Sequence, residues 1–263
     1  LKEASERKLR TCVLVIKHKS DVIIDAVDDL TDRVESINFD HWETDELEKI
    51  GELGFHDTLN LDVPEKFIHI LAKESIRSPY LMQKLCFNAC SIIGYTKQQE
   101  TMTSVDITND DIEMTLRQTA SSLENSYSKI FHVLNGDSFT GGKRNEITFV
   151  DGEEGDIYQA MMRAIAADPI QTSFKQSELI SRINDEVDYI TRVSDGERVQ
   201  EVNTGSVISA YQNVDEKISE VKPKTSVLDW DEDKKQLSVG KTGLILYLRW
   251  SDKMNVERSI DVL

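Results

Sequence analysis

The chain has 263 residues and a formal net charge of −17 at pH 7, from 48 acidic and 31 basic side chains. This balance argues against a general binder of nucleic acids or membrane surfaces, because attraction to phosphates needs clustered Lys and Arg. The hydrophobic content of 39% is typical of a globular protein with one large domain or two to three small ones.

The three cysteines, Cys12, Cys86 and Cys90, give no disulfide framework and indicate a reducing cytosol. Cys86 and Cys90 lie four residues apart on an expected helix. A metal pair is one interpretation, but no second Cys/His pair accompanies them, so we interpret them as small buried hydrophobic residues. There is no signal peptide and no run of 18 apolar residues, so we expect a cytoplasmic protein without membrane contact.

The first predicted element is a strand at residues 11–16, which are β-branched and almost wholly apolar, as in a buried parallel sheet. Polar residues follow it directly at 17–21, and ligands bind at such strand ends in open α/β sheets. A lone strand cannot form a sheet. We therefore expect its partners upstream of Leu1, and a first residue other than Met suggests a fragment, a processed chain or missing residues.

The pattern from about residue 44 to 134 predicts a bundle of four helices with short links. Thr44 can cap the first helix, and Gly51 and Gly54 are expected to end it. Pro64 suits the first position of the second helix. A fourth helix is expected to run from about Thr108 to 134.

A break stands out before the third of these helices, in the stretch from Glu74 to Gln83. One apolar helix ends near it, Pro79 lies inside it, and a second apolar helix starts from it with Leu81, Leu85 and Ala89 on one stripe. A structural interpretation is that Pro79 simply starts a helix.

Residues 135–155 are rich in Gly, Asp, Glu and Asn and predict a linker with a short strand at Ile147–Val150. Beyond it we expect three helices, at Asp156–Ala167, Gln176–Val187 and Gly205–Val221. A hairpin of Ser226–Trp230 and Gln236–Val239 follows, and Gly243–Trp250 is one more apolar strand or helix. Three helices and a hairpin are the pattern of a winged helix, in which the acidic insert at 188–203 would lengthen a turn.

No complete phosphate-binding loop occurs in the 263 residues. Gly240-Lys241-Thr242 resembles the end of such a loop, but Lys235 stands where the motif needs its first Gly. Gly142-Lys143 is also incomplete as such a loop, because Asp137 stands where the motif needs its first Gly. Both segments are better interpreted as solvated turns.

A family resemblance rests on the order of several short motifs. A strand with a polar end, Asp32-Arg33, Trp42, Glu46-Leu47, the Ser78-Pro79 break and a winged helix follow one another. This order resembles the C-terminal half of a P-loop ATPase of the AAA+/STAND group, most similar to its origin-recognition-like members. The implied fold is mainly α with small β elements. It comprises the end of an α/β P-loop core (1–42), a helical lid (43–134), a linker (135–155) and a winged-helix domain (156–263).

The resemblance implies roles for particular residues. His18, with Lys17 or Ser20, lies where the family places a polar sensor near the γ-phosphate. Arg33 resembles an arginine finger for a neighbouring subunit's nucleotide, and the alternative is a surface Arg paired with a nearby Asp.

In the lid, Pro79 matches the proline near adenine, with Arg77 and Tyr80 as possible nucleotide contacts. The family's lid Arg is replaced by Leu81 or Met82. ATP and Mg²⁺ are expected for the full-length protein and not for this chain alone.

For the winged helix, DNA contacts would come from the third helix and the wing. The candidates are Ser206, Ser209, Gln212 and Lys217, with Lys234 and Lys235 on the wing. Residues 204–250 hold seven basic and seven acidic side chains, which disfavours DNA and makes protein–protein packing at least as good an interpretation.

Two functions from different classes follow. The first is the C-terminal portion of an ATP-binding, oligomerising switch or scaffold, with antiviral (phage) defence as the implied setting and a homo-oligomer or effector protein as partner. The full-length protein would be an ATPase, although this chain lacks the phosphate-binding loop. The second is a DNA-binding winged-helix regulator with a helical dimerisation domain. A weaker third interpretation is an adaptor whose acidic surface docks a basic partner.

Overall fold

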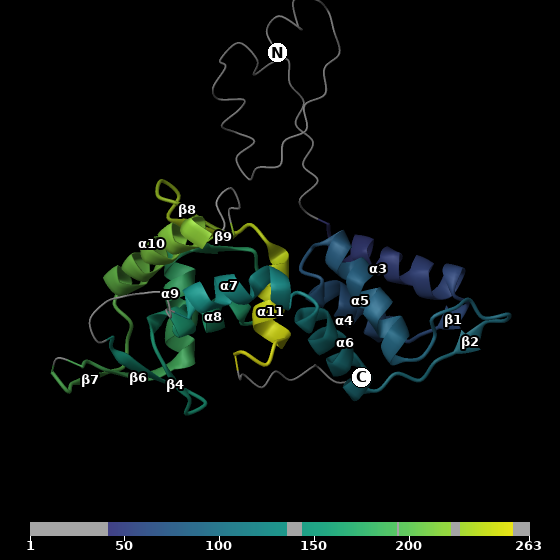
Figure 1. Cartoon of the computed structure of the whole chain (residues 1–263), viewed down its shortest axis with the longest axis horizontal. Helices are drawn as coiled ribbons and strands as arrows, with labels where there is room; N and C mark the ends of the chain where they lie inside the picture. The colour runs from purple at the N-terminus through teal and green to yellow at the C-terminus, as the bar shows by residue number, and fades with distance from the viewer. Residues whose placement is uncertain (1–41, 136–143, 194, 222–226, 255–263) are drawn as a thin grey trace, which may run out of the picture. The chain divides into compact units, whose positions relative to one another are not determined.

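The computed structural model describes residues 42–135, 144–193, 195–221 and 227–254, all within one compact unit. These residues are mainly helical with small sheets (Figure 1), which confirms the expected fold class at this coarse level. The expected strand at 11–16, His18 and Arg33 lie outside the described residues. Over the described ranges, every helix is too short or too polar to span a membrane.

The first half of the described chain is a set of helices joined by short links. In chain order they are α3 (Thr44–Glu52), the π-helical turn η2 (Leu53–Thr58), α4 (Glu65–Glu74), α5 (Pro79–Ile92), α6 (Asn109–Ser121) and α7 (Glu124–Leu134). Strands β1 (Leu61–Asp62) and β2 (Thr103–Ser104) pair in parallel. The apolar stripe predicted for α5 is buried at Leu81, Leu85 and Ala89.

The first helix differs from its prediction at both ends. Its N-cap is Glu43 rather than Thr44, in a capping box with Glu46. Gly51 and Gly54 do not end it, because the chain continues through Gly51 directly into η2. A Cβ on Gly51 would lie 2.8 Å from Cγ2 of Ile68, so this glycine allows α3 to approach α4 closely.

The predicted fourth helix is two helices. The helix α6 begins near Thr108 as expected, and Thr108 is its N-cap, whose hydroxyl accepts the Asp111 amide at 3.2 Å. The helix ends at Ser121. The hydroxyl of its C-cap, Ser122, donates to the Thr119 carbonyl at 2.6 Å, and α7 begins at Glu124. Such side-chain bonds to the backbone compete with helix continuation.

The second half of the described chain combines helices with two antiparallel sheets. Its elements are β3 (Glu146–Phe149), β4 (Glu154–Gly155), α8 (Ile157–Ala166), β5 (Ser173–Lys175), α9 (Gln176–Glu186), β6 (Val187–Thr191), β7 (Arg198–Val199), α10 (Thr204–Val221), β8 (Leu228–Asp231), β9 (Gln236–Val239) and α11 (Thr242–Trp250). The sheet orders are β4-β3-β6-β7 and β5-β9-β8.

Most of these elements match their predictions. The three helices and the hairpin are present, and the short strand expected at Ile147–Val150 is β3, which pairs with β6. The acidic insert at 188–203 is not a simple turn, because it forms most of β6 and all of β7. The run Gly243–Trp250, left open as strand or helix, is helical and buried throughout.

Helix α11 lies at the centre of the described unit. It packs against α6, α7 and α8, and is the yellow helix beside them in Figure 1. A Cβ on Gly243 would lie 2.7 Å from the Tyr127 hydroxyl, and Tyr247 Oη donates to Glu124 Oε2 at 2.5 Å. These contacts join α11 to α7.

Candidate functional site

The break between α4 and α5 is a left-handed turn. Ile76 and Arg77 have φ values of 52° and 59°, a conformation in which L-residues are disfavoured. The Ser75 amide donates to the Leu71 carbonyl at 2.9 Å, and the Ser78 amide donates to the Ser75 carbonyl at 3.0 Å. Two consecutive residues therefore reverse the chain within one hydrogen-bonded turn.

Helix α5 starts directly after this turn. Ser78 is its N-cap, accepting the Leu81 amide at 3.3 Å through its hydroxyl, and Pro79 occupies the first turn. This arrangement confirms that Pro79 starts a helix. It leaves the predicted nucleotide contact of Pro79 untested.

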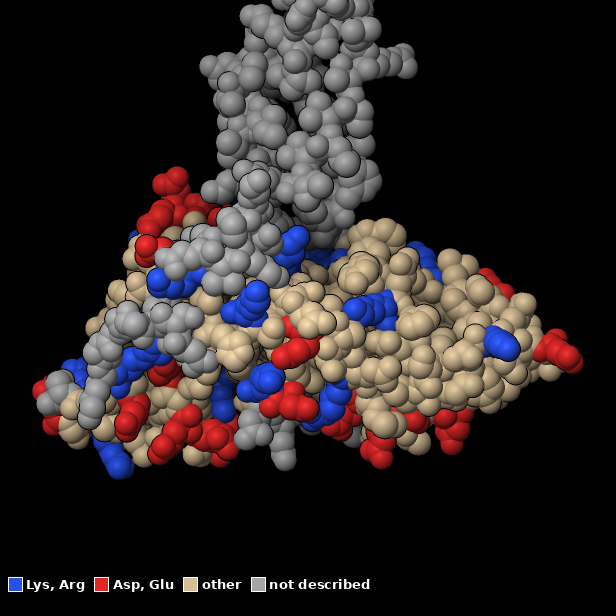
Figure 2. Space-filling model, in the orientation of Figure 1, with Lys and Arg blue, Asp and Glu red and all other residues tan. Residues whose placement is uncertain are grey.

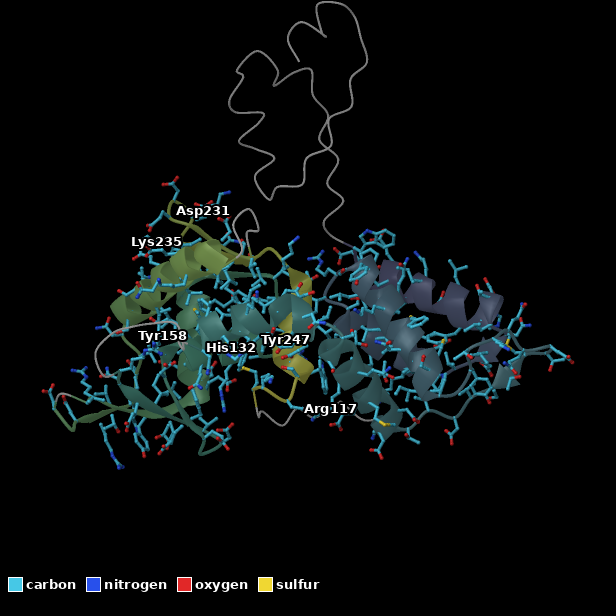
Figure 3. All side chains as sticks on the ribbon, in the orientation of Figure 1. Arg117, His132, Tyr158, Asp231, Lys235 and Tyr247 are labelled. Carbon is cyan, nitrogen blue, oxygen red and sulfur yellow. The ribbon has the colours of Figure 1, made fainter. Side chains whose placement is uncertain are left out.

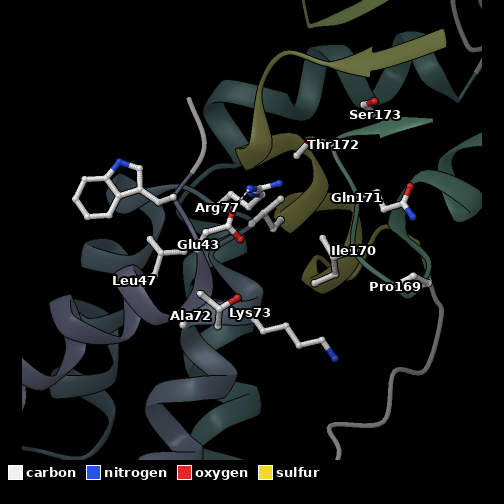
Figure 4. Close-up of a pocket in the computed structure, with 13 residues that line it drawn as sticks. Glu43, Leu47, Ala72, Lys73, Arg77, Pro169, Ile170, Gln171, Thr172 and Ser173 are labelled. Atoms are coloured by element: carbon white, nitrogen blue, oxygen red, sulfur yellow. Dashed lines mark hydrogen bonds and ion pairs between the residues drawn. The ribbon is translucent and has the colours of Figure 1, made fainter. Parts of the chain in front are cut away.

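A cavity of about 450 Å³ lies against the turn. One wall, which we name the lid wall, consists of residues 42–44, Leu47, 72–73 and 76–77. The opposite wall, the loop wall, consists of residues 169–173 between α8 and β5. Figure 4 shows Glu43, Lys73 and Arg77 on one side and Pro169 to Ser173 on the other.

The cavity is lined by polar and apolar residues in similar measure and carries both charges. Arg77 forms an ion pair with Glu43, drawn as a dashed line in Figure 4. Lys73 is exposed on the lid wall, and Trp42 is 37% exposed there. Two cationic residues and a tryptophan thus line one hollow.

Only one of the three predicted nucleotide contacts lines this cavity. Arg77 does, whereas Pro79 and Tyr80 do not. Tyr80 is 64% exposed on α5, and Lys84 Nζ lies 5.9 Å from its ring centroid. Sequence reasoning missed Glu43 and Lys73 as cavity residues. Glu43 caps α3 although it is not among the residues preferred at that position, so the sequence carried no clear signal for it.

A buried ionic network lies directly behind the turn. Arg249 on α11 donates to both carboxylate oxygens of Glu74, from Nη2 at 2.7 Å and from Nε at 3.0 Å. Trp250 Nε1 donates to the same carboxylate at 2.6 Å. Arg249 Nη1 donates to the Ala166 carbonyl at 2.6 Å, and Nη2 lies 3.4 Å from both carboxylate oxygens of Asp168.

The charge of this network is compensated within it. Burial lowers the pKa of Arg249, but the hydrogen bonds and charge of Glu74, with those of Asp168, outweigh burial and raise it overall. The guanidinium therefore stays charged, and its bonds to both oxygens of the Glu74 carboxylate hold the pair in one geometry.

The loop wall has a second anchor in Arg182 of α9. Its guanidinium donates to the carbonyls of Pro169 at 2.8 Å and Ala167 at 3.2 Å. These bonds satisfy carbonyls at and beyond the end of α8 that have no helical partner. Two buried arginines thus fix the start of this wall.

The predicted DNA contacts lie on α10 and on the β8–β9 turn. Ser206, Ser209 and Gln212 are exposed on α10, and Lys217 is half-buried. Lys234 and Lys235 are exposed on the turn, where Figure 3 labels Asp231 and Lys235. The structure therefore places all six on the surface or near it.

Carboxylates surround these candidates. Glu232 Oε1 accepts from Gln212 Nε2 at 3.4 Å, and Asp231 Oδ2 lies 3.8 Å from Lys234 Nζ. Figure 2 shows acidic side chains gathered over the β8–β9 turn, where Glu232 and Asp233 are exposed. This arrangement weakens any attraction to a phosphate backbone.

Cys86 and Cys90 lie on α5 as free, half-buried thiols. Burial, with a smaller contribution from the charge of Cys90, raises the pKa of Cys86 to about 12. Within the described ranges, no three His, Cys, Asp or Glu side chains gather in a way that could hold a metal ion. Both thiols pack against the hydrophobic core.

The chain was also compared with protein families, with curated proteins and with solved structures, and none of them matched.

Proposed function

We propose that this chain is the C-terminal portion of an ATP-binding, oligomerising switch of the AAA+/STAND type. The observation that carries the proposal is the left-handed turn at Ile76-Arg77, which presents Arg77 to a cavity just before the α5 proline. Consecutive strained residues beside a cavity are a feature of ligand-binding sites. Helices α3 to α6 would serve as the nucleotide lid.

The order of elements in the second half supports the same proposal. Helices α8, α9 and α10 with strands in the order β5-β9-β8 match a winged helix, with β6 and β7 as an insertion. A lid followed by a winged helix is the arrangement that the resemblance implies. Such proteins switch by rigid-body movements of these parts.

The chemistry of the cavity suits part of a nucleotide. Arg77 and Lys73 can bind phosphate oxygens, and Trp42 offers an aromatic face to a base. Its volume falls in the range of small-molecule sites. A phosphate would compete with Glu43 for Arg77, so binding would replace one charge-assisted contact by another.

The 263 residues contain no complete phosphate-binding loop, so ATP turnover requires groups from elsewhere. We expect the full-length protein to hydrolyse ATP with Mg²⁺, and residues 1–263 to lack turnover. An oligomer, with phage defence as its setting, remains part of the proposal. Equal turnover by both proteins would contradict it.

The sharper test is a variant of Arg77 in the full-length protein. Loss of one charge-assisted contact in Arg77→Ala should weaken binding of a fluorescent ATP analogue by about 10-fold to 100-fold. Arg117→Ala is the matched control, because Arg117 is similarly exposed and pairs with Glu113 on α6. We expect the control to bind like the wild type.

Equal affinity of Arg77→Ala and the wild type would remove Arg77 from the nucleotide site. Equal loss in both variants would indicate a general effect of positive charge. Absence of binding by the wild-type full-length protein would overturn the proposed function.

A second candidate function is a DNA-binding winged-helix regulator with a helical dimerisation domain. The exposed positions of Ser206, Ser209 and Gln212 on α10 favour it. It requires duplex affinity that falls steeply with salt. The acidic β8–β9 turn opposes it.

A further inference from the structure

The two walls of the cavity are joined by one side chain outside it. Arg249 is 5% exposed and does not line the cavity. Its Nη2 and Nε bind Glu74, the last residue of α4, three positions before Arg77. Its Nη1 binds the Ala166 carbonyl at the end of α8, from which the loop wall starts.

We propose that Arg249 is a positioning residue that sets the spacing of the lid wall and the loop wall. The guanidinium acts as a rigid fork with donors in fixed directions. It holds Glu74 and the end of α8 at the same time. The role of Arg249 in wall spacing is independent of the proposed function. Its expected effect on nucleotide binding, described below, rests on the proposed function.

The bonds around Glu74 are strong enough to hold the lid wall. The carboxylate accepts two hydrogen bonds from the Arg249 guanidinium, and Glu74 is 5% exposed. Charge-assisted bonds of this kind are about twice as strong as neutral ones. Glu74 is therefore fixed, and with it the entry to the Ile76-Arg77 turn.

The wall spacing can be measured directly with a pair of spin labels. Exposed Lys66 on α4 and exposed Lys175 at the end of β5 are replaced by labelled cysteines, with the three native cysteines replaced by alanine. In Arg249→Lys, the charge remains but the fork is lost. We expect a broader distribution of label-to-label distances than in the parent protein.

Trp250→Phe is the matched control. It removes one bond to the Glu74 carboxylate from the neighbouring buried residue but leaves both connections of Arg249. We expect its distance distribution to equal that of the parent. An unchanged distribution in Arg249→Lys, or the same broadening in both variants, would overturn the proposal. If Arg249→Lys does not fold, Glu74→Gln is used with the same expectation.

A binding cycle separates positioning from a general structural effect. In the full-length protein, Arg249→Lys should weaken the ATP analogue by about 10-fold when Arg77 is present. In the Arg77→Ala background it should have little further effect, because the wall residue that Arg249 positions is gone. Additive losses would contradict positioning through Arg77. No ATP binding at all would contradict the proposed function and leave the spin-label result to decide the wall spacing.

Discussion

At the scale of single residues, two of the four non-glycine residues with positive φ in the described ranges, Ile76 and Arg77, follow one another. Ile76 is β-branched, is buried to 2% exposure and has a φ of 52°, and Arg77 follows with a φ of 59°. Each such residue costs on the order of 1–3 kcal/mol. Neither position is a glycine, the residue that adopts this conformation without strain. Ile76 packs in the core and Arg77 faces the cavity.

This strain predicts an unusual order of stability among Arg77 variants. Arg77→Gly and Arg77→Ala both lose the ion pair with Glu43, so their difference isolates the backbone. Gly adopts the left-handed region without strain, whereas Ala in this region is destabilised by a close contact of its Cβ with the backbone. We expect Arg77→Gly to have the higher free energy of unfolding, by roughly 1 kcal/mol. The difference in free energy of unfolding between the two variants is measured by urea denaturation.

Arg117 supplies the comparison, because it lies inside the regular helix α6. There Ala is the better helix former by about 1 kcal/mol, so the order of the two variants should reverse. The same order at both positions would show that the Arg77 turn is not strained in solution.

At the scale of elements, close packing explains why a glycine lies inside a helix. Gly51 faces Ile68 on α4 and Met82 on α5, whose nearest atoms would be 2.8 Å and 3.0 Å from an added Cβ. We expect Gly51→Ala to lower the free energy of unfolding by about 1–3 kcal/mol, because α3 would be pushed from its neighbours.

Gly54 is the natural control for this prediction. It lies in η2, three residues further on, with nothing within 4 Å of an added Cβ. Gly54→Ala should therefore raise the free energy of unfolding by about 0.5–1 kcal/mol. If both variants changed stability alike in thermal and urea unfolding, helix propensity rather than packing would govern Gly51.

Elements with local signals were predictable from the sequence. Ser78, Thr108 and Asp156 cap α5, α6 and α8 through side-chain bonds that act within three residues. The strands β6 and β7 could not be predicted from the sequence, because their pairing depends on partners such as β3, far away in the chain. The sequence did not decide between strand and helix for α11, because a helix buried on all sides shows no periodic polar face.

The candidate site was predictable only in part. Arg77 was named through the resemblance, and its place beside a cavity agrees with a ligand contact without testing one. The pair of Glu74 and Arg249 spans 175 residues, and no local pattern marks it. Contacts of this length arise from tertiary packing, which periodicity and capping do not encode.

At the scale of the whole molecule, the burial of basic side chains makes the protein surface more acidic than the sequence alone indicates. Arg163, Arg182 and Arg249 are each at most 8% exposed. They bind carboxylates or backbone carbonyls inside the fold, at Asp151, at Pro169 and at Glu74. Three of the 31 basic side chains thus offer little to an outside partner. Repulsion of phosphate backbones follows from this distribution and from the net charge of −17.

This distribution gives a clear expectation for duplex DNA. At about 50 mM salt we expect affinity no better than the non-specific range of roughly 10⁻⁴–10⁻⁶ M, measured by fluorescence anisotropy. Neutralising the exposed turn with Glu232→Gln and Asp233→Asn should strengthen binding by at most about 10-fold, while the backbone amides that Asp231 caps stay in place. Glu153→Gln with Glu154→Gln removes the same charge beside β4 and should change nothing. Submicromolar affinity of the wild type that is lost in Lys234→Ala and Lys235→Ala would instead establish the winged-helix regulator, since those lysines would then contact phosphates.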